Sequence, residues 1–134
     1  MKVKVMIEIA ENGYSAYMAT RHPQYGLIGE GKTVDETIAD FKSSYEEMKS
    51  VIETSGREFI PAEFEFCYDM ASFLEEFSKT FTLAGLERIT GINQKQLGHY
   101  LSGSSKPRKA TVDRMRDGLR RFTEELSAVN FIGD

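Results

Sequence analysis

The spacing of apolar residues changes along this chain, and the change limits the folds that it can adopt. Over residues 3–9 apolar and polar side chains alternate, which is the period of a half-buried β-strand. Beyond Asp69 apolar residues recur at every third or fourth position, which is the period of an amphipathic α-helix. The two periods predict an α+β protein with a β-containing domain over residues 1–68 and an all-helical domain over residues 69–134. With 134 residues, of which 40% are hydrophobic, the chain is long enough for two small domains.

The first domain is predicted to follow the order β-β-β-α-β. Asn12-Gly13 marks a tight hairpin after the first strand, and residues 14–19 and 26–29 are the second and third strands of a meander. A long amphipathic helix follows. Aromatic and polar residues then alternate over residues 64–68, which predicts that a fourth strand returns to the sheet.

Polar residues mark where the helices should begin. Thr33 and Glu36 have the spacing of a capping box, so the helix of the first domain should start at Val34, and Gly56 suits its end. In the second domain the predicted N-caps are Asp69, Thr82 and Asn93. The first helix expected there carries an apolar stripe from Met70 to Phe81. Three further helices are expected over residues 83–90, 94–102 and 110–129. The apolar side of the last helix comprises Val112, Met115, Leu119, Phe122, Leu126 and Val129.

The segment from Gly91 to Gly103 has the sequence GINQKQLGHYLSG, which is typical of the turn and second helix of a helix-turn-helix. Such a helix places the side chains at its front in the major groove of double-stranded DNA, where Gln can bond adenine and Lys can donate to guanine. The residues predicted to contact bases are Gln94, Lys95, Gln96 and His99. Those predicted to contact phosphates are Ser102, Lys106, Arg108 and Lys109.

Charge is divided unequally along the chain. Residues 1–78 hold 7 Lys and Arg against 15 Asp and Glu, whereas residues 79–134 hold 10 against 6. The basic half suits nucleic acid, and the acidic half suits a basic protein or solvent alone. A module that binds protein and dimerises without touching DNA is the alternative reading of the whole chain.

The sequence gives weaker support for an enzymatic function. Gly26 to Thr33 matches the P-loop pattern of nucleotide-binding proteins, but the predicted antiparallel domain leaves no room for the covered parallel sheet of that fold. A nuclease-like metal site could be built from Glu8, Asp35 and Asp69, although Asp35 suits a helix first turn and Asp69 suits a cap. We therefore expect neither catalysis nor a cofactor.

Other sequence features bear on location and on metals. A lone Cys67 excludes an intramolecular disulfide, and His22 and His99 are too far apart in sequence to suggest a zinc site with it. The sequence contains no stretch of membrane-spanning length and does not open on a signal-peptide pattern, so we expect a cytoplasmic protein without a membrane partner.

Two family resemblances add to these predictions. The segment 83–109 resembles the phage-repressor (Cro-like) helix-turn-helix family, with matches at Leu86, Gly91, Ile92, Leu97 and Gly103. It differs from that family at Glu87, where a small residue is preferred, and at Thr90, where an apolar one is preferred. Because single helix-turn-helix units usually read two half-sites, a homodimer or higher oligomer is expected.

Nearly the full length resembles the HicB antitoxin family. The resemblance rests on the return strand NGYSAY at 12–17 and on the helix entry at 31–38, followed by a repressor-like domain. It implies a partial ribonuclease-H-like fold without nuclease activity, operator binding through the C-terminal domain, and binding of a small basic RNA-cleaving toxin through the N-terminal domain.

Overall fold

The computed structural model describes residues 1–133 as an α+β protein. The chain divides into two compact units, which we call unit 1, Met1–Glu76, and unit 2, which begins at Phe77. Each unit is described by itself below. Among the described residues no helix combines the length and the apolar character needed to cross a membrane.

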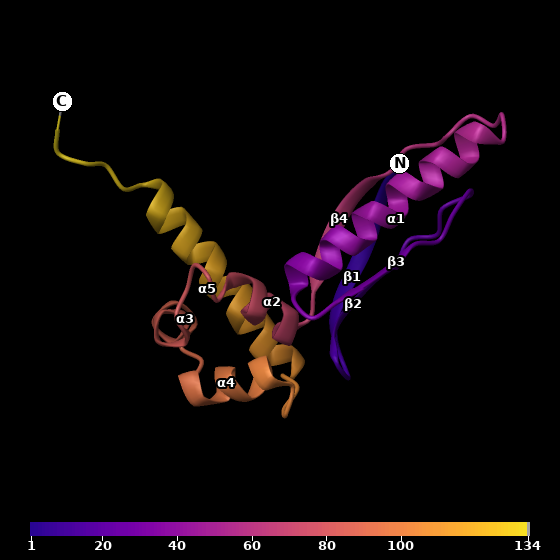
Figure 1. The fold of residues 1–134 in the computed structure, drawn as a ribbon. Helices are drawn as coiled ribbons and strands as arrows, with labels where there is room; N and C mark the ends of the chain where they lie inside the picture. Colours follow the sequence, from indigo (N-terminus) through magenta and orange to yellow (C-terminus); the bar gives the residue numbers. More distant parts are fainter. Residues whose placement is uncertain (134) are drawn as a thin grey trace. The chain divides into compact units, whose positions relative to one another are not determined.

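Unit 1 is built on a four-stranded mixed sheet with the strand order β3-β2-β1-β4. The strands are β1 (Lys2–Ala10), β2 (Gly13–Met18), β3 (Ile28–Gly31) and β4 (Glu63–Tyr68), and the helix α1 (Val34–Thr54) separates β3 from β4. The first three strands pair in antiparallel fashion and β4 lies parallel to β1, as Figure 1 shows. The predicted order of elements is confirmed.

The third strand begins later than its predicted position at residues 26–29. Gly26 and Leu27 precede β3, where the Leu27 side chain is buried and its N–H donates to Met18 Sδ at 3.2 Å. That contact takes the Leu27 amide out of the ladder, and the register with β2 starts at Ile28, which pairs with Tyr17.

One face of the sheet packs on α1 (Figure 1). Val3, Val5 and Ile7 of β1 are fully buried there, together with Phe41 of α1. The alternation that predicted a strand thus places these three β1 side chains on the core face and Lys4, Met6 and Glu8 on the opposite face. The capping box is present as well, because Thr33 Oγ1 accepts from Glu36 N at 3.1 Å.

Helix α2 (Met70–Phe77) belongs mostly to unit 1, whereas the pattern of apolar residues assigned it to the second domain. Asp69 caps it by accepting from Ser72 N at 2.8 Å, and the same carboxylate accepts from Ile9 N at 3.1 Å. The Ser72 hydroxyl also donates to Ile7 O at 2.7 Å. These contacts across some 60 positions of sequence attach the start of α2 to the end of β1. Phe81 lies beyond this helix and packs on Phe122 in unit 2.

Unit 2 contains α3 (Leu83–Thr90), α4 (Gln94–Ser102) and α5 (Lys109–Ser127). The predicted caps are confirmed: Thr82 Oγ1 accepts from Gly85 N, and Asn93 Oδ1 accepts from Lys95 N. The buried apolar residues of the unit are Leu86, Ile92, Leu97, Tyr100 and Met115. Helices α3 and α5 cross closely at Gly118, where an added Cβ would lie 2.8 Å from Ile89 O.

The predicted apolar side of the last helix is buried only in part. Met115 is 5% exposed, but Leu126 is 58% and Val129 is 49% exposed. Helix α5 ends at Ser127, earlier than the predicted residue 129.

Candidate nucleic-acid interface

Helix α4 buries one side and presents the other to solvent. Leu97 and Tyr100 face the core of unit 2, while Gln94, Lys95 and His99 are exposed. Lys95 and His99 are four residues apart and so lie on the outer face of the helix, opposite Leu97 and Tyr100, and Gln94 lies at the edge of that face. Ser102 is exposed one turn further on. The outer face of α4 is therefore polar, with its basic and amide groups at the front of the helix.

The turn before α4 is held by side chains from the helix that precedes it. Gly91 ends α3 with φ at 75°, a left-handed conformation that glycine adopts without strain. Glu87 Oε1 accepts from Gln94 N at 2.7 Å and so bonds a free amide of the first turn of α4. The buried Thr90 hydroxyl donates to Leu86 O at 2.7 Å and accepts from Ile92 N at 3.1 Å.

Glu87 and Thr90 are the two positions at which the sequence differs from the repressor-like pattern. Both use their polar atoms to hold the turn, which a small residue at 87 or an apolar residue at 90 would not do. The polar side chains at these two places fix the direction in which α4 leaves α3.

Arg114 of α5 braces the same turn. Its Nη2 donates to Gly91 O at 2.7 Å, so α5 holds the carbonyl group at the end of α3. This role was not predicted from the sequence. Arg114 lies 23 positions from Gly91 in sequence, and no local spacing indicates such a contact.

Gln96 differs from the other predicted base-contacting residues. It is half-buried, and its Nε2 donates to Ser105 Oγ at 3.3 Å. His99 keeps an exposed ring whose Nδ1 lies 3.4 Å from Ser104 Oγ. Of the predicted set, Gln94, Lys95 and His99 are presented outward, and Gln96 lies at the edge of that face.

The predicted phosphate-contacting residues fall into two groups. Lys106 and Arg108 are exposed in the segment between α4 and α5, and within residues 1–133 neither has an acidic partner in ion-pair contact. Lys109 pairs with Asp113 at 3.2 Å, and Arg116 pairs with the same carboxylate at 2.9 Å. The hydrogen bond from Lys109, followed by that from Arg116, holds the pKa of Asp113 below its ordinary value. The positive charge of Lys109 is thus partly balanced.

The Ser102 hydroxyl is occupied locally. It donates to His99 O at 3.1 Å and lies 3.0 Å from Ser104 Oγ. A phosphate contact from this side chain would need that small serine cluster to rearrange. Among the predicted phosphate-contacting residues, Lys106 and Arg108 are therefore the ones whose side chains are free to approach an anion.

Unit 2 thus combines a braced turn, an outward polar helix and exposed cations. Comparison of the chain with protein-family models, curated proteins and solved structures gives no match. The resemblances to the repressor and antitoxin families remain predictions from the residues.

The P-loop-like segment of unit 1 has a different geometry from a phosphate cradle. Peptide N–H groups that would face phosphate donate to carboxylates: Glu30 N to Asp40 Oδ2, Lys32 N to Glu36 Oε2 and Val34 N to Glu75 Oε2. The segment also includes β3, an edge strand of the sheet. Its donors are already bonded to negative groups, which would repel a nucleotide phosphate.

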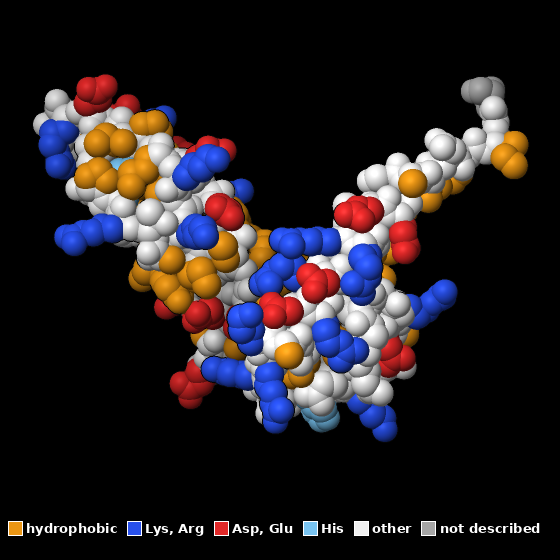
Figure 2. Space-filling view, turned by 180° about the vertical axis from the view of Figure 1, so that it is seen from behind, with side chains coloured by type: hydrophobic (Ala, Val, Ile, Leu, Met, Phe, Trp, Pro, Cys, Tyr) orange, Lys and Arg blue, Asp and Glu red, His pale blue; other side chains and the backbone are white. Residues whose placement is uncertain are grey.

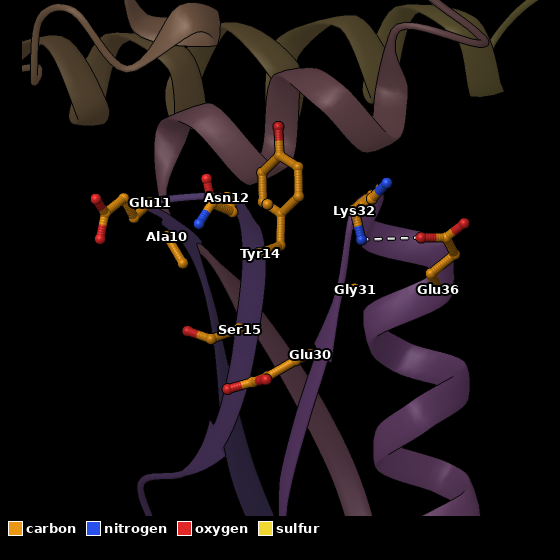
Figure 3. A pocket seen from close by; sticks show the side chains of 10 residues that line it. Ala10, Glu11, Asn12, Tyr14, Ser15, Glu30, Gly31, Lys32 and Glu36 are labelled. Atoms are coloured by element: carbon orange, nitrogen blue, oxygen red, sulfur yellow. Dashed lines mark hydrogen bonds between the residues drawn. The ribbon is translucent and has the colours of Figure 1, made fainter.

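The pocket beside this segment is acidic. Its volume is about 710 Å³, and Glu11, Glu30, Glu36 and Lys32 line it with Tyr14. Figure 3 shows these side chains and the bond from the Lys32 amide to Glu36. Burial, then the negative charges of Glu75 and Asp69, raise the pKa of Tyr14. Such a pocket disfavours anions.

The side chains considered above as metal ligands do not form a cluster in the described part of the chain. Within residues 1–133 no three His, Cys, Asp or Glu side chains approach closely enough to hold a metal ion. Both oxygens of Asp69 accept main-chain N–H groups, from Ser72 and Ile9. His22 is 6% exposed and stacks on Tyr25 with ring centroids 3.8 Å apart.

The face of the sheet opposite α1 carries an apolar row. Strand pairing places Ile28, Tyr17, Met6 and Cys67 side by side across β3, β2, β1 and β4. Ile28 is 66% and Tyr17 is 38% exposed. Lys4 and Glu8 flank Met6 on the same face of β1, and Figure 2 shows hydrophobic side chains among charged ones on this side of unit 1. Register between strands, rather than proximity in sequence, assembles this row.

Proposed function

We propose that the protein is a DNA-binding transcriptional repressor in which α3, the turn at Gly91 and α4 act as a helix-turn-helix. The observation that carries the proposal is the outward face of α4, where Gln94, Lys95 and His99 project from a helix whose opposite side is buried. Side chains of this kind at the front of a helix suit the donor and acceptor pattern of the major groove.

The surrounding residues support this assignment. Glu87 and Thr90 hold the angle between the two helices through their bonds to Gln94 N and Ile92 N. Lys106 and Arg108 follow α4 and offer charges for phosphates, which contribute affinity and register without sequence preference. Two copies would read two half-sites of an operator.

An electrophoretic mobility shift on the DNA upstream of the gene, repeated over a series of salt concentrations, tests the proposal. Binding should weaken as salt rises, because cations released from the DNA drive association. Binding that is absent at low salt, or that ignores salt, would contradict it.

Variants separate the two kinds of contact. The changes Gln94→Ala and His99→Ala should alter the preferred sequence, whereas Lys106→Ala and Arg108→Ala should each weaken binding to all sequences and reduce the salt slope by about 1. Lys49→Ala, which removes an equal charge from the exposed side of α1, is the matched control and should change neither.

A second candidate function belongs to unit 1. We infer that it binds a small basic protein, as an antitoxin of the HicB type with a partial ribonuclease-H-like fold would do. The apolar row through Tyr17 and Met6, on a unit with 15 acidic and 7 basic residues, favours this reading. A complex with the product of a neighbouring reading frame, lost in Ile28→Glu but kept in Val51→Glu, would support it. No complex with any such product would leave a solitary repressor.

A further inference from the structure

A hollow of about 580 Å³ lies between α3 and α5 in unit 2. The two helices lie side by side (Figure 1), and they are closest at Gly118, where an added Cβ would be 2.8 Å from Ile89 O. Both of these residues line the hollow, which extends along α5 as far as Glu125 and reaches Thr80 ahead of α3. Its volume falls in the range of about 300–1,000 Å³ that is typical of small-molecule sites.

One wall of the hollow is apolar and aromatic. The rings of Phe81 and Phe122 meet edge to face, with centroids 6.1 Å apart and planes at 74°. Both side chains are half-buried, as is that of Ile89, and all three line the hollow. Gly85 lines it from α3 without a side chain of its own. Such a wall suits a flat apolar group, an aromatic ring above all.

Each of the two helices contributes one arginine to the hollow. Arg88 of α3 and Arg121 of α5 are exposed and line it. Within residues 1–133 neither guanidinium group has a carboxylate in ion-pair contact or a hydrogen-bond acceptor. A guanidinium group with free N–H groups matches the two oxygens of a carboxylate. The hollow therefore joins an apolar wall to two uncompensated positive charges.

Glu125 limits how much negative charge the hollow can accept. It lines the hollow one turn after Arg121 but does not pair with it, and arginine before glutamate is the less favourable order for a pair on a helix. Its carboxylate would repel a second negative charge on a ligand. The lining as a whole, with two arginines and one glutamate, thus favours a monocarboxylate over a phosphate or a dicarboxylate.

We propose that the hollow between α3 and α5 is a binding site for a small aromatic monocarboxylate. Arg88 and Arg121 hold the carboxylate, and the ring of the ligand packs on Phe81 and Phe122. The site goes beyond the proposed contacts with DNA, because none of its lining residues belongs to α4. A ligand bound there leaves the outward face of α4 open.

Titration of the full chain with sodium phenylacetate, without DNA, tests the site. Main-chain amide signals followed by two-dimensional NMR should shift to saturation, with the largest shifts at Gly85, Ile89, Gly118 and Phe122. Acetate lacks the ring and 2-phenylethanol lacks the charge, so each should bind about tenfold more weakly or worse. Sodium chloride of equal ionic strength is the blank. Shifts that do not saturate, or that saturate at other residues, would overturn the proposal.

Substitutions at the arginines test how the charge is held. Arg88→Gln and Arg121→Gln should each raise the Kd of phenylacetate about tenfold, with circular dichroism unchanged. Arg120→Gln removes an equal charge from the neighbouring position of α5, outside the hollow, and should leave the Kd unchanged. Glu125→Gln should lower the Kd, because it removes the repelling charge. Equal effects of Arg120→Gln and Arg121→Gln would reduce the binding to general attraction and overturn the site. Because DNA is absent throughout, these results are independent of operator binding.

Discussion

Glu87 Oε1 accepts a hydrogen bond from the main-chain N–H of Gln94 at 2.7 Å, so α3 caps α4 through a side chain seven positions earlier in sequence. A carboxylate at the front of a helix also interacts favourably with the helix dipole. The bond explains why a long acidic residue stands where a compact one would allow closer helix contact: it fixes the start of the helix that presents Gln94 and Lys95.

Removing this cap should destabilise unit 2. We expect Glu87→Ala to lower the free energy of unfolding by about 1 kcal/mol, as is typical for the loss of an N-terminal cap. Glu87→Gln keeps an oxygen that can accept from Gln94 N and should retain most of the stability. Urea titration followed by helical circular dichroism measures both. Equal losses in the two variants would show that charge, and not the hydrogen bond, is what matters.

The buried hydroxyl of Thr90 should be needed for the turn. Thr90→Val keeps the shape but leaves Ile92 N without its acceptor, and an unsatisfied buried N–H costs about 1–3 kcal/mol. Thr90→Ser, which keeps the hydroxyl, should be closer to the wild type. Denaturation midpoints of the three proteins test this, and a valine variant as stable as the wild type would refute the assigned role.

Two glycines within helices should respond in opposite directions to alanine. Gly118→Ala should destabilise unit 2, since the new Cβ would lie 2.8 Å from Ile89 O and 3.0 Å from Thr90 Cα. Gly98→Ala meets only Leu83 Cδ1 at 3.9 Å and should stabilise α4 by about 0.5–1 kcal/mol, because alanine loses less backbone entropy on folding. Thermal unfolding measures the direction in which each variant shifts the melting temperature. If both variants shifted it in the same direction, the crossing of α3 and α5 would have relaxed at little cost in free energy.

Unit 1 should lose stability in mild acid because of His22. Burial lowers the pKa of this side chain below its ordinary 6.5, and its Nδ1 accepts from Gln24 N at 3.1 Å, which requires the neutral ring. Below pH 6.5 the His22 side chain therefore binds a proton more readily in the unfolded chain than in the folded chain. The contribution of neutral His22 to the free energy of unfolding is complete above that pH and falls as pH decreases.

Unfolding free energies at about pH 7.5 and about pH 5.5 should show this decrease in the wild type. His22→Phe keeps a ring to stack on Tyr25 but cannot be protonated, so its decrease should be smaller. The comparison isolates the contribution of His22 to the pH dependence. An identical pH dependence in both proteins would exclude His22 as the cause.

Much of the local structure could be predicted from the sequence because it depends on groups a few positions apart. The alternation of Val3, Val5 and Ile7 indicates a strand whatever it pairs with, and Thr33, Thr82 and Asn93 cap helices that begin within three residues of them. Gly91 ends α3 for the same local reason. The exposed residues at the front of α4 follow from helical spacing once Leu97 is placed in the core.

Tertiary structure alone decided the contacts between segments distant in sequence. Asp69 is recognisable as a cap, but only the sheet brings it to Ile9 and so assigns α2 to unit 1. Arg114 reaches Gly91 only because α5 crosses α3, and Leu126 is exposed because those helices do not extend alongside it. The spacing of apolar residues indicates that one face of a helix or strand can be buried. It does not predict which element covers that face or over what length, because these depend on the free energies of strand pairing and side-chain packing.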